Sequence, residues 1–287
     1  MTPPVWQYAL AAAAVFGWMF VWRLVRRRLS DQPELPLEPR QPTPWGLGDV
    51  SLIILGFLLF SLVTPSLLGI GEDIESATLQ QSLTMVTIVD LLTFVWALVV
   101  LKARGATWAD MGIWPTRMRR DLLLGLIGFA VILVPVYVLQ RMLVQWFADP
   151  HPAAKMFLSA EDPLAILHVV LVVSVVAPLV EEMLFRVVLQ GWLETALGSM
   201  TMPMVDESGQ IIEPAYTPAP SAMVISAFIF AAMHIRPQSA DPIPLFIVAL
   251  VLGYLYQRTH RIWPSLVMHV TLNSTSLLQL LAESGKG

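Results

Sequence analysis

LAILHVVLVVSVVAPLVEEMLFRVVLQGW, residues 164–192, is the stretch that decides the fold of this chain. It is longer than the roughly 20 apolar residues that a helix needs to cross about 30 Å of hydrocarbon. Three charged side chains nevertheless lie inside it: Glu181, Glu182 and Arg186. One charge at mid-membrane costs roughly 2.5 to 3.5 kcal/mol on insertion scales, so three of them must be paired or used. The stretch therefore predicts a membrane-spanning helix with polar groups inside the protein.

The composition of the whole chain also indicates a membrane protein. Hydrophobic residues make up 56% of the 287 positions and charged residues only 13%, whereas an ordinary globular domain has about 25% charged residues. The net charge of -4 gives no reason to expect a nucleic-acid partner. The chain has no cysteine, which excludes disulfides, thiolate nucleophiles and cysteine-based zinc sites.

Apolar stretches of suitable length recur along the sequence. They predict an all-α, polytopic transmembrane bundle of about eight helices. The expected spans are residues 5–22, 51–70, 83–101, 122–139, 164–192, 222–235, 243–256 and 262–281. The positive charges follow the first span instead of preceding it, so this span is not a cleavable signal peptide.

The distribution of basic residues predicts the orientation of these spans. Arg23, Arg26, Arg27 and Arg28 follow the first span and place its end in the cytoplasm by the positive-inside rule. With eight spans, the loops assigned inside contain 12 of the 17 Lys and Arg residues, the outside loops and tail contain four, and Arg186 lies within a helix. We therefore expect both termini outside, in a multi-pass protein of the plasma (inner) membrane.

Proline-rich segments divide the chain. Residues 1–29 are expected to be an N-terminal transmembrane anchor, residues 30–49 an extended and unpacked cytoplasmic linker, and residues 50–282 the main transmembrane domain, with its motif core at 164–282. Prolines within residues 30–49 favour extended backbone over packed structure. A second proline-rich stretch, residues 203–220, predicts a loop or short hairpin near the membrane surface.

The three charges of the opening stretch have different expected roles. Glu182 and Arg186 are four residues apart on one helix face and form a predicted structural ion pair, with Gln190 and Glu194 continuing the same face. Glu181 points about 100° away, which leaves it as the free carboxylate. Proline at position 178 removes a backbone donor and is expected to bend the helix one turn before the acids.

Further polar residues on two other predicted helices complete a candidate site. His234 follows Phe230 at the end of an apolar helix, and His269 lies four residues before Asn273 in the last helix. If these groups converge, Glu181 and His234 can activate a water molecule while His269 and Asn273 donate hydrogen bonds to the developing oxyanion. This arrangement predicts a peptide hydrolase that uses neither serine nor cysteine.

Simpler interpretations remain open for several of these groups. An intramembrane histidine is often only a hydrogen-bonding residue between helices, and for His234 the two interpretations have equal weight. His168 is expected to have such a structural role. Asp90, in the third span, is expected to form an interhelical hydrogen bond, with a functional role as the alternative. His151 and His260 fall in predicted loops and are expected to be solvated.

The three motifs, in this order, resemble those of the CAAX protease and bacteriocin-processing family, whose pattern is EExxxR, FxxxH and HxxxN or HxxxD. The matching residues are Glu181, Glu182 and Arg186, then Phe230 and His234, then His269 and Asn273. The run at residues 253–259 is also similar to the family's G-x-L-Y-x-R-T pattern. The resemblance implies an all-helical intramembrane endopeptidase. It further implies Glu181 as general base assisted by His234, and His269 with Asn273 at the oxyanion, while Glu182, Arg186 and Phe230 support the site.

The sequence leaves alternatives open for the substrate, for the cofactor and for the catalytic function. The expected partners are the lipid bilayer and a peptide or protein substrate, which some family members take in lipidated form. A non-catalytic membrane scaffold or immunity protein and a proton-coupled transporter are the alternative functions. No cofactor is favoured, but Glu181, His234 and His269 are the alternative ligands for a divalent metal such as zinc.

Overall fold

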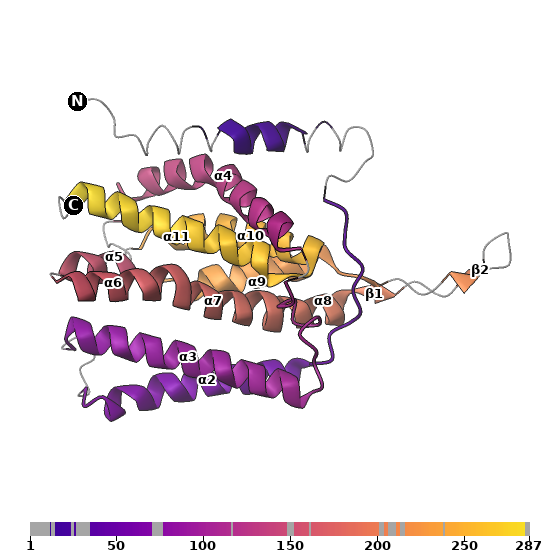
Figure 1. Ribbon diagram of the computed structural model, residues 1–287, viewed down its shortest axis with the longest axis horizontal. Coiled ribbons are helices and arrows are strands. Elements are labelled where there is room, and N and C mark those ends of the chain that lie inside the picture. The colour runs from indigo at the N-terminus through magenta and orange to yellow at the C-terminus, as the bar shows by residue number, and fades with distance from the viewer. Residues whose placement is uncertain are drawn as a thin grey trace.

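The computed structural model describes residues 12, 15–23, 26, 35–70, 77–115, 117–147, 152–160, 162–200, 204–205, 211–212, 216–237 and 239–284. Most of these residues are helical, and the long helices run side by side in a bundle (Figure 1). The helices are α2 (Leu47–Leu67), α3 (Leu79–Ala103), α4 (Met118–Leu143), α5 (Pro152–Ser159), α6 (Pro163–Leu171), α7 (Ala177–Glu182), α8 (Gly191–Leu197), α9 (Pro220–Ala232), α10 (Pro242–Thr259) and α11 (Ile262–Ser284). Two π-helical segments, η2 (Val172–Val176) and η3 (Met183–Gln190), join α6, α7 and α8 into one continuous helix.

Within the described part of the chain, five helices are long and apolar enough to cross a membrane. They are α2, α3, α4, the continuous helix from Pro163 to Leu197, and α10. Helix α9 is apolar but has only 13 residues. The protein is thus an integral membrane protein, whereas the expected total of eight spans remains a prediction. Part of the first expected span lies outside the described residues, which are helical over 15–23.

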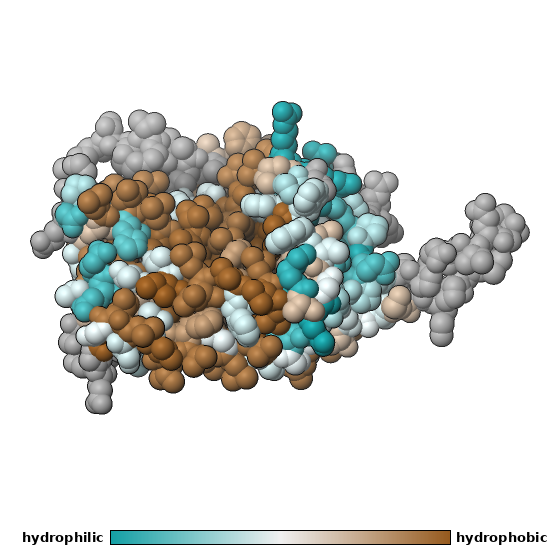
Figure 2. Space-filling model, turned by 60° about the horizontal axis from the view of Figure 1, so that its bottom comes forward, coloured by the Kyte–Doolittle hydropathy of each residue, from teal (hydrophilic) through white to brown (hydrophobic). Residues whose placement is uncertain are grey.

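The surface of the bundle is apolar over a wide area, as expected for a protein surrounded by lipid. Apolar side chains cover the broad middle of the face shown in Figure 2, and hydrophilic residues gather toward its ends. Large side chains point outward on several helices, among them Leu62 of α2 at 76% exposure and Phe228 of α9 at 66%. A soluble protein rarely exposes apolar patches of this extent. Lipid is the solvent that such a surface fits.

Local sequence signals fix where two of the long helices begin. At the start of α3, Thr78 Oγ1 accepts from the Gln81 amide at 3.2 Å and the Gln81 side chain accepts from the Thr78 amide at 3.0 Å, which is a capping box. At the start of α6, Asp162 Oδ1 accepts from the amides of Leu164 and Ala165, both at 2.9 Å. Proline at 163 suits the first helical position. The helix that carries the two glutamates therefore has a defined start.

Helix packing brings the motif helices together in the bundle. Helix α4 packs along α11, α10 packs on α9, and α2 packs on α3. The continuous helix from Pro163 to Leu197 lies between the α2–α3 pair and the remaining helices (Figure 1). It contacts α3, α9, α10 and α11. The EExxxR segment thus faces every helix that carries another motif.

The proline-rich linker is packed against the bundle, so the expectation of an unpacked segment is wrong for its described part. Residues 36–46 have no helix or strand, and they run across one end of the bundle (Figure 1). Trp45 is 2% exposed and its indole Nε1 donates to the Val188 carbonyl at 3.1 Å. The Thr43 amide donates to Thr195 Oγ1 at 2.8 Å. Proline prevents regular structure, but it does not prevent flanking side chains from finding buried partners.

The residues that follow α8 form the expected hairpin. Strand β1 (Ser199–Met200) pairs antiparallel with β4 (Tyr216–Thr217). Strand β2 (Met204–Val205) pairs antiparallel with β3 (Ile211–Ile212). The hairpin extends away from the helices at the end of the bundle where the linker lies (Figure 1).

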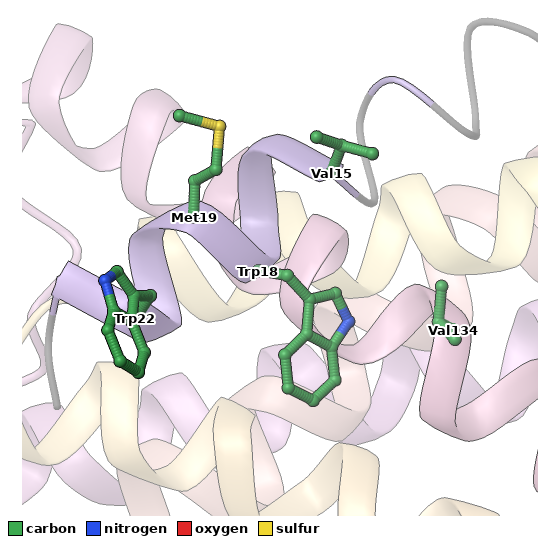
Figure 3. A pocket seen from close by; sticks show the side chains of 5 residues that line it. All are labelled: Val15, Trp18, Met19, Trp22 and Val134. Atoms are coloured by element: carbon green, nitrogen blue, oxygen red, sulfur yellow. The ribbon is translucent and has the colours of Figure 1, made fainter.

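The N-terminal helix contacts α4 through a glycine. A Cβ added at Gly17 would lie 2.4 Å from the carbonyl carbon of Ala130, so the two backbones approach closely only because Gly17 has no side chain. Small residues at helix contacts are typical of membrane proteins. Next to this contact, an apolar groove of about 550 Å³ is lined by Val15, Trp18, Met19 and Trp22 together with Val134 of α4 (Figure 3).

Candidate active site

Two π-helical segments flank the short helix that carries the paired glutamates. Segment η2 precedes α7, and segment η3 begins directly after Glu182. Pro178 lies at the start of α7, where its missing N–H leaves one carbonyl of the preceding turn without its helical donor. The wider turn appears in η2, where the Ala177 amide bonds to the Val172 carbonyl five residues back. Such local widening is frequent at functional sites.

Glu182 is the central acceptor of the site. Its Oε2 accepts from Arg186 Nε at 3.1 Å, and its Oε1 lies 3.0 Å from His269 Nδ1. The side chains of Glu182 and Arg186 are both 0% exposed. An ionised carboxylate has no proton to donate, so the Nδ1 of His269 is the donor. Glu182 thus links α7 to α11 and sets the orientation of the imidazole ring.

Glu181 contacts the other nitrogen of the same histidine. Its Oε2 lies 3.5 Å from His269 Nε2, and its side chain is 29% exposed. Glu181 thus points away from the Glu182–Arg186 pair, as expected, and faces a residue of another helix. His269 lies between two carboxylates that come from adjacent positions of one helix. Glu181 is the more accessible of the two, which suits a group that must meet water and substrate.

Phe230 forms an apolar wall that touches three of the other motif residues. The Arg186 guanidinium carbon lies 5.3 Å from the centre of the Phe230 ring, a cation–π geometry. The Phe230 ring is 4.8 Å from the His234 ring and 6.1 Å from the His269 ring, centre to centre. Phe230 is 1% exposed. The FxxxH motif therefore packs directly on the EExxxR and HxxxN motifs.

His234 lies just beyond the end of α9, half-buried. Its Nδ1 is 2.8 Å from the Phe230 carbonyl oxygen. A carbonyl oxygen only accepts, so Nδ1 donates its proton and the neutral ring keeps its lone pair on Nε2. This tautomer presents a basic nitrogen, which is the form that a proton acceptor requires.

Asn273 is bonded to the helix that carries the glutamates. Its Nδ2 donates to the carbonyl oxygen of Val173, in η2, at 2.9 Å. An amide group has two N–H donors, so the second remains available for a substrate oxygen. Asn273 therefore ties α11 to the widened turn before Pro178, a structural role that the sequence pattern did not indicate.

Asp90 of α3 lies on the side of the site opposite α11. The buried positions of α3 include Leu83, Thr93, Ala97 and Leu101, and Asp90 falls on the same stripe at helical spacing. Helix α3 packs against η2 and α7, and the Asp90 carboxyl interacts electrostatically with Glu181. Asp90 thus adds a second carboxyl group near Glu181. His168 has the expected structural role, because its Nε2 lies 3.2 Å from Thr87 Oγ1 of α3.

A second polar cluster, which the sequence reasoning missed, lies at the end of the bundle near the linker. Arg40 Nη1 is 3.3 Å from Glu194 Oε2 and 3.1 Å from His260 Nδ1. The expectation of a solvated His260 is wrong, because the residue is only 9% exposed. Burial, followed by the positive charges of Arg40 and Arg261, lowers the pKa of His260 to about 3. The continuation of the polar face to Gln190 and Glu194 was the signal that buried partners were required.

The described residues do not form a ready-made metal site. Among them, no three His, Asp or Glu side chains are grouped in a way that could hold a metal ion. His269 Nδ1 contacts the Glu182 carboxylate, a bond that a metal-binding histidine typically makes through its other ring nitrogen. His269 Nε2 lies 3.5 Å from Glu181 Oε2, and the alternative zinc set of Glu181, His234 and His269 stays a prediction.

Comparison with known proteins agrees with the motifs. Residues 163–275 match the family model described as type II CAAX prenyl endopeptidase Rce1-like. This confirms the resemblance, and the matched segment contains all three motifs. No curated protein and no solved structure matches the chain. Residues 163–275 are thus similar to a family of CAAX-type membrane proteases, and the apolar helices make the protein an integral membrane protein.

Proposed function

We propose that this protein hydrolyses a peptide bond within the membrane by means of a water molecule activated by Glu181. The observation that carries the proposal is the contact of His269 with both glutamates, at 3.5 Å to Glu181 and 3.0 Å to Glu182. A hydrogen-bonded chain in which one carboxylate orients a histidine beside a second, accessible carboxylate is the arrangement of a catalytic group with its support. Charges this deep in a membrane protein are otherwise costly to keep.

In the proposed reaction, Glu181 takes a proton from water as the oxygen attacks the substrate carbonyl carbon. The negative charge that develops on the carbonyl oxygen is stabilised by the second amide N–H of Asn273 and by the Nε2–H of His269 in its doubly protonated form, because the Nδ1–H of His269 is already donated to Glu182. His234 Nε2, which carries the lone pair, holds the attacking water in place. The proton on Glu181 then passes to the amine nitrogen as the C–N bond breaks, which restores the carboxylate.

The substrate class follows from the surroundings and from the family. A bundle with an apolar exterior (Figure 2) suits a peptide substrate that is itself held in the bilayer. We therefore propose a lipidated peptide or protein as the substrate, in keeping with the CAAX-type family match of residues 163–275.

The test is cleavage of a farnesylated CAAX peptide by the purified protein in liposomes. Glu181→Gln keeps the size of the side chain but removes the proton acceptor, so turnover should fall by at least about 10² while the melting temperature stays within the error of the wild type. Equal cleavage by both proteins would remove Glu181 from the chemistry. Binding of the peptide without cleavage by the wild type would instead favour the non-catalytic scaffold.

Chelation separates the proposed mechanism from a zinc mechanism. Because the proposal routes the proton through Glu181 alone, exhaustive treatment with a chelator should leave turnover of the same peptide largely intact. Loss of turnover that zinc alone restores, together with loss of bound zinc in variants of Glu181, His234 and His269, would establish the metal mechanism in its place.

A further inference from the structure

A stripe of buried polar side chains leads from the site to the end of the bundle near the linker. Glu182, Arg186, Gln190 and Glu194 follow one another at four-residue spacing, and each is 0% exposed. Gln190 Nε2 donates to Glu194 Oε1 and to the Gly253 carbonyl, both at 2.9 Å. The stripe is therefore continuous over three helical turns, from the site glutamates to the Arg40 and His260 cluster.

Many polar atoms along this stripe have no protein partner among the described residues. They are Nη1 and Nη2 of Arg186, Oε1 of Gln190, the hydroxyl groups of Tyr216 and Tyr256, Nη2 of Arg40 and Nε2 of His260, all buried. The Tyr256 hydroxyl lies near Arg40, the Tyr216 hydroxyl near Thr195 and the His260 ring near the Glu38 backbone, but none of these contacts satisfies hydrogen-bond geometry. A buried donor or acceptor without a partner costs about 1 to 3 kcal/mol. Summed over these seven atoms, this cost is of the same order as the whole free energy of unfolding of an ordinary domain, about 5 to 15 kcal/mol.

The atoms have the chemistry that bound water requires. The guanidinium of Arg40 can only donate, so Nδ1 of His260 accepts from it and Nε2 of the neutral ring carries a proton. The stripe thus offers donors from Arg186, Arg40 and His260 and an acceptor from Gln190. A water molecule typically makes about three hydrogen bonds in such surroundings. Among the described residues, no side-chain or backbone group lies within hydrogen-bond geometry of these atoms.

Two glycines let the backbone approach these atoms closely. A Cβ at Gly253 would lie 2.9 Å from Gln190 Oε1, and a Cβ at Gly191 would lie 3.1 Å from Arg40 Nη2. The far end of the stripe approaches the surface at Tyr216, which is half-buried while its hydroxyl is buried. The stripe therefore has one end in the protein interior and one end near bulk solvent.

We propose that ordered water molecules occupy this stripe and form a hydrated path that supplies the site with water. The supply role rests on the proposed function, because each hydrolysed bond consumes one water molecule inside an apolar bundle. The hydration itself does not depend on catalysis. The hydration follows from the buried polar atoms that have no hydrogen-bond partner among the described residues. Two of them, Gln190 Oε1 and the Tyr256 hydroxyl, are thereby assigned as water-binding groups.

Hydroxyl-radical footprinting of the resting protein in ¹⁸O-labelled water tests the hydration directly. Radiolysis of a bound water oxidises side chains beside it, even when bulk solvent does not reach them. Tyr256, at 0% exposure, should take up the label. Phe157, at 1% exposure within an apolar cluster, is the matched buried control and should remain unlabelled. Equal absence of label at both residues would overturn the proposal.

Turnover of two tyrosine variants tests the supply role. Tyr256→Phe keeps the ring and removes one water-binding hydroxyl, so turnover should fall roughly fivefold without a rise in KM. Tyr137→Phe is the matched control, because the Tyr137 hydroxyl lies 3.3 Å from Ser276 Oγ, away from the stripe. If Tyr256 takes up label while both variants turn over equally, the supply role is wrong. If neither the wild type nor the variants cleave the peptide, the footprinting result still tests whether water occupies the stripe.

Discussion

At the scale of single residues, the site depends on how two adjacent glutamates divide their contacts. Glu182 is fully buried and bonded to Arg186 and His269, whereas Glu181 is 29% exposed and reaches only the far nitrogen of His269 among these groups. The first arrangement holds structure together, and the second leaves a carboxylate accessible to water. Substitution of a residue that pairs with Glu182 should therefore lower stability first, whereas substitution of Glu181 should lower activity first.

Replacement of Arg186 by Ala should lower stability before it affects chemistry. The change leaves the buried Glu182 carboxylate without its ion-pair partner, and removal of one member of a buried pair costs about 3 to 5 kcal/mol. Melting temperature in detergent, measured beside single-turnover cleavage, reports both properties. A double change of Glu182→Gln and Arg186→Met should recover part of the lost stability. An Arg186→Ala protein that melts normally yet is inactive would show that we assigned the roles of the two glutamates the wrong way round.

His260 should make the folded protein less stable as the pH falls below neutrality. Burial and the charges of Arg40 and Arg261 lower its pKa from 6.5 to about 3. Between these values the unfolded chain binds a proton that the folded chain does not, so the free energy of unfolding falls as pH falls, by up to about 1.4 kcal/mol per pH unit.

The measurement is the melting temperature in detergent at pH 7, 6 and 5 for the wild type and for His260→Asn. Asparagine does not titrate, and it tolerates the left-handed backbone at this position, where φ is 50°. The variant should therefore lose less stability over this interval than the wild type. Parallel pH dependence of the two proteins would contradict the assignment of the proton to His260.

At the scale of elements, loops and the linker hold one end of the bundle together. Arg261 donates to both oxygens of Asp121 in α4, at 2.8 and 3.0 Å from Nε, and also pairs with Glu38 of the linker. Glu38 contacts Arg117 and Arg120 as well. The Arg261 side chain is only 8% exposed, so solvent screens its pairs with Asp121 and Glu38 less than the pair of Glu38 with Arg117, whose side chain is 55% exposed. The linker is thus a structural part of the bundle, not only a connection to the anchor.

Gly112 should be far less tolerant of a side chain than Gly105, although both have positive φ, at 67° and 81°. A Cβ at Gly112 would lie 2.4 Å from the His260 carbonyl oxygen, whereas a Cβ at Gly105 would meet nothing within 4 Å. Gly105→Ala should therefore cost about 1 kcal/mol of backbone strain, and Gly112→Ala should cost a further 1 to 3 kcal/mol, roughly, from overpacking.

Thermal unfolding of the two glycine variants in the same detergent measures this difference. The strain at positive φ is common to both proteins, so the gap in melting temperature isolates the contact between the loop before α4 and the α10–α11 turn. Equal melting temperatures would show that this contact contributes nothing to stability.

At the scale of the whole molecule, the bundle has one chemically distinct end. The linker, the start of α4 and the α10–α11 turn lie together there, as the backbone bonds from Glu38 to Arg258 and from Ile262 to Gly112 show. The same end carries most of the arginines that the positive-inside rule assigns to the cytoplasm. The hydrated stripe and the linker contacts would then face the cytoplasm.

The orientation predicts that both termini lie outside. A reporter that is active only outside the cytoplasm, fused after Gly287, should therefore be active in cells. A reporter placed within the 105–116 loop should give the opposite result, because that loop belongs to the positively charged side. Activity of a cytoplasmic reporter after Gly287 would overturn the eight-span topology.

The sequence by itself determined that the chain is a membrane bundle with a polar face at residues 182, 186, 190 and 194. Hydrophobic length, helical spacing and the cost of charge in hydrocarbon are properties of short segments, and they need no knowledge of distant contacts. The three motifs also carried the resemblance to the CAAX-type family, which the match of residues 163–275 confirms. The sequence therefore selected the residues of the candidate site, although not their contacts.

Only the tertiary structure decided which atoms meet. The bond between His269 and Glu182 joins residues 87 positions apart, and the contact between Arg40 and His260 joins residues 220 apart. No local pattern encodes such separations, because they depend on how complete helices pack. For this reason the linker was expected to be unpacked and His260 to be solvated, each from a local rule that a distant partner overrode. A residue's neighbours along the helix set its direction, but its environment is set by the helix packed opposite.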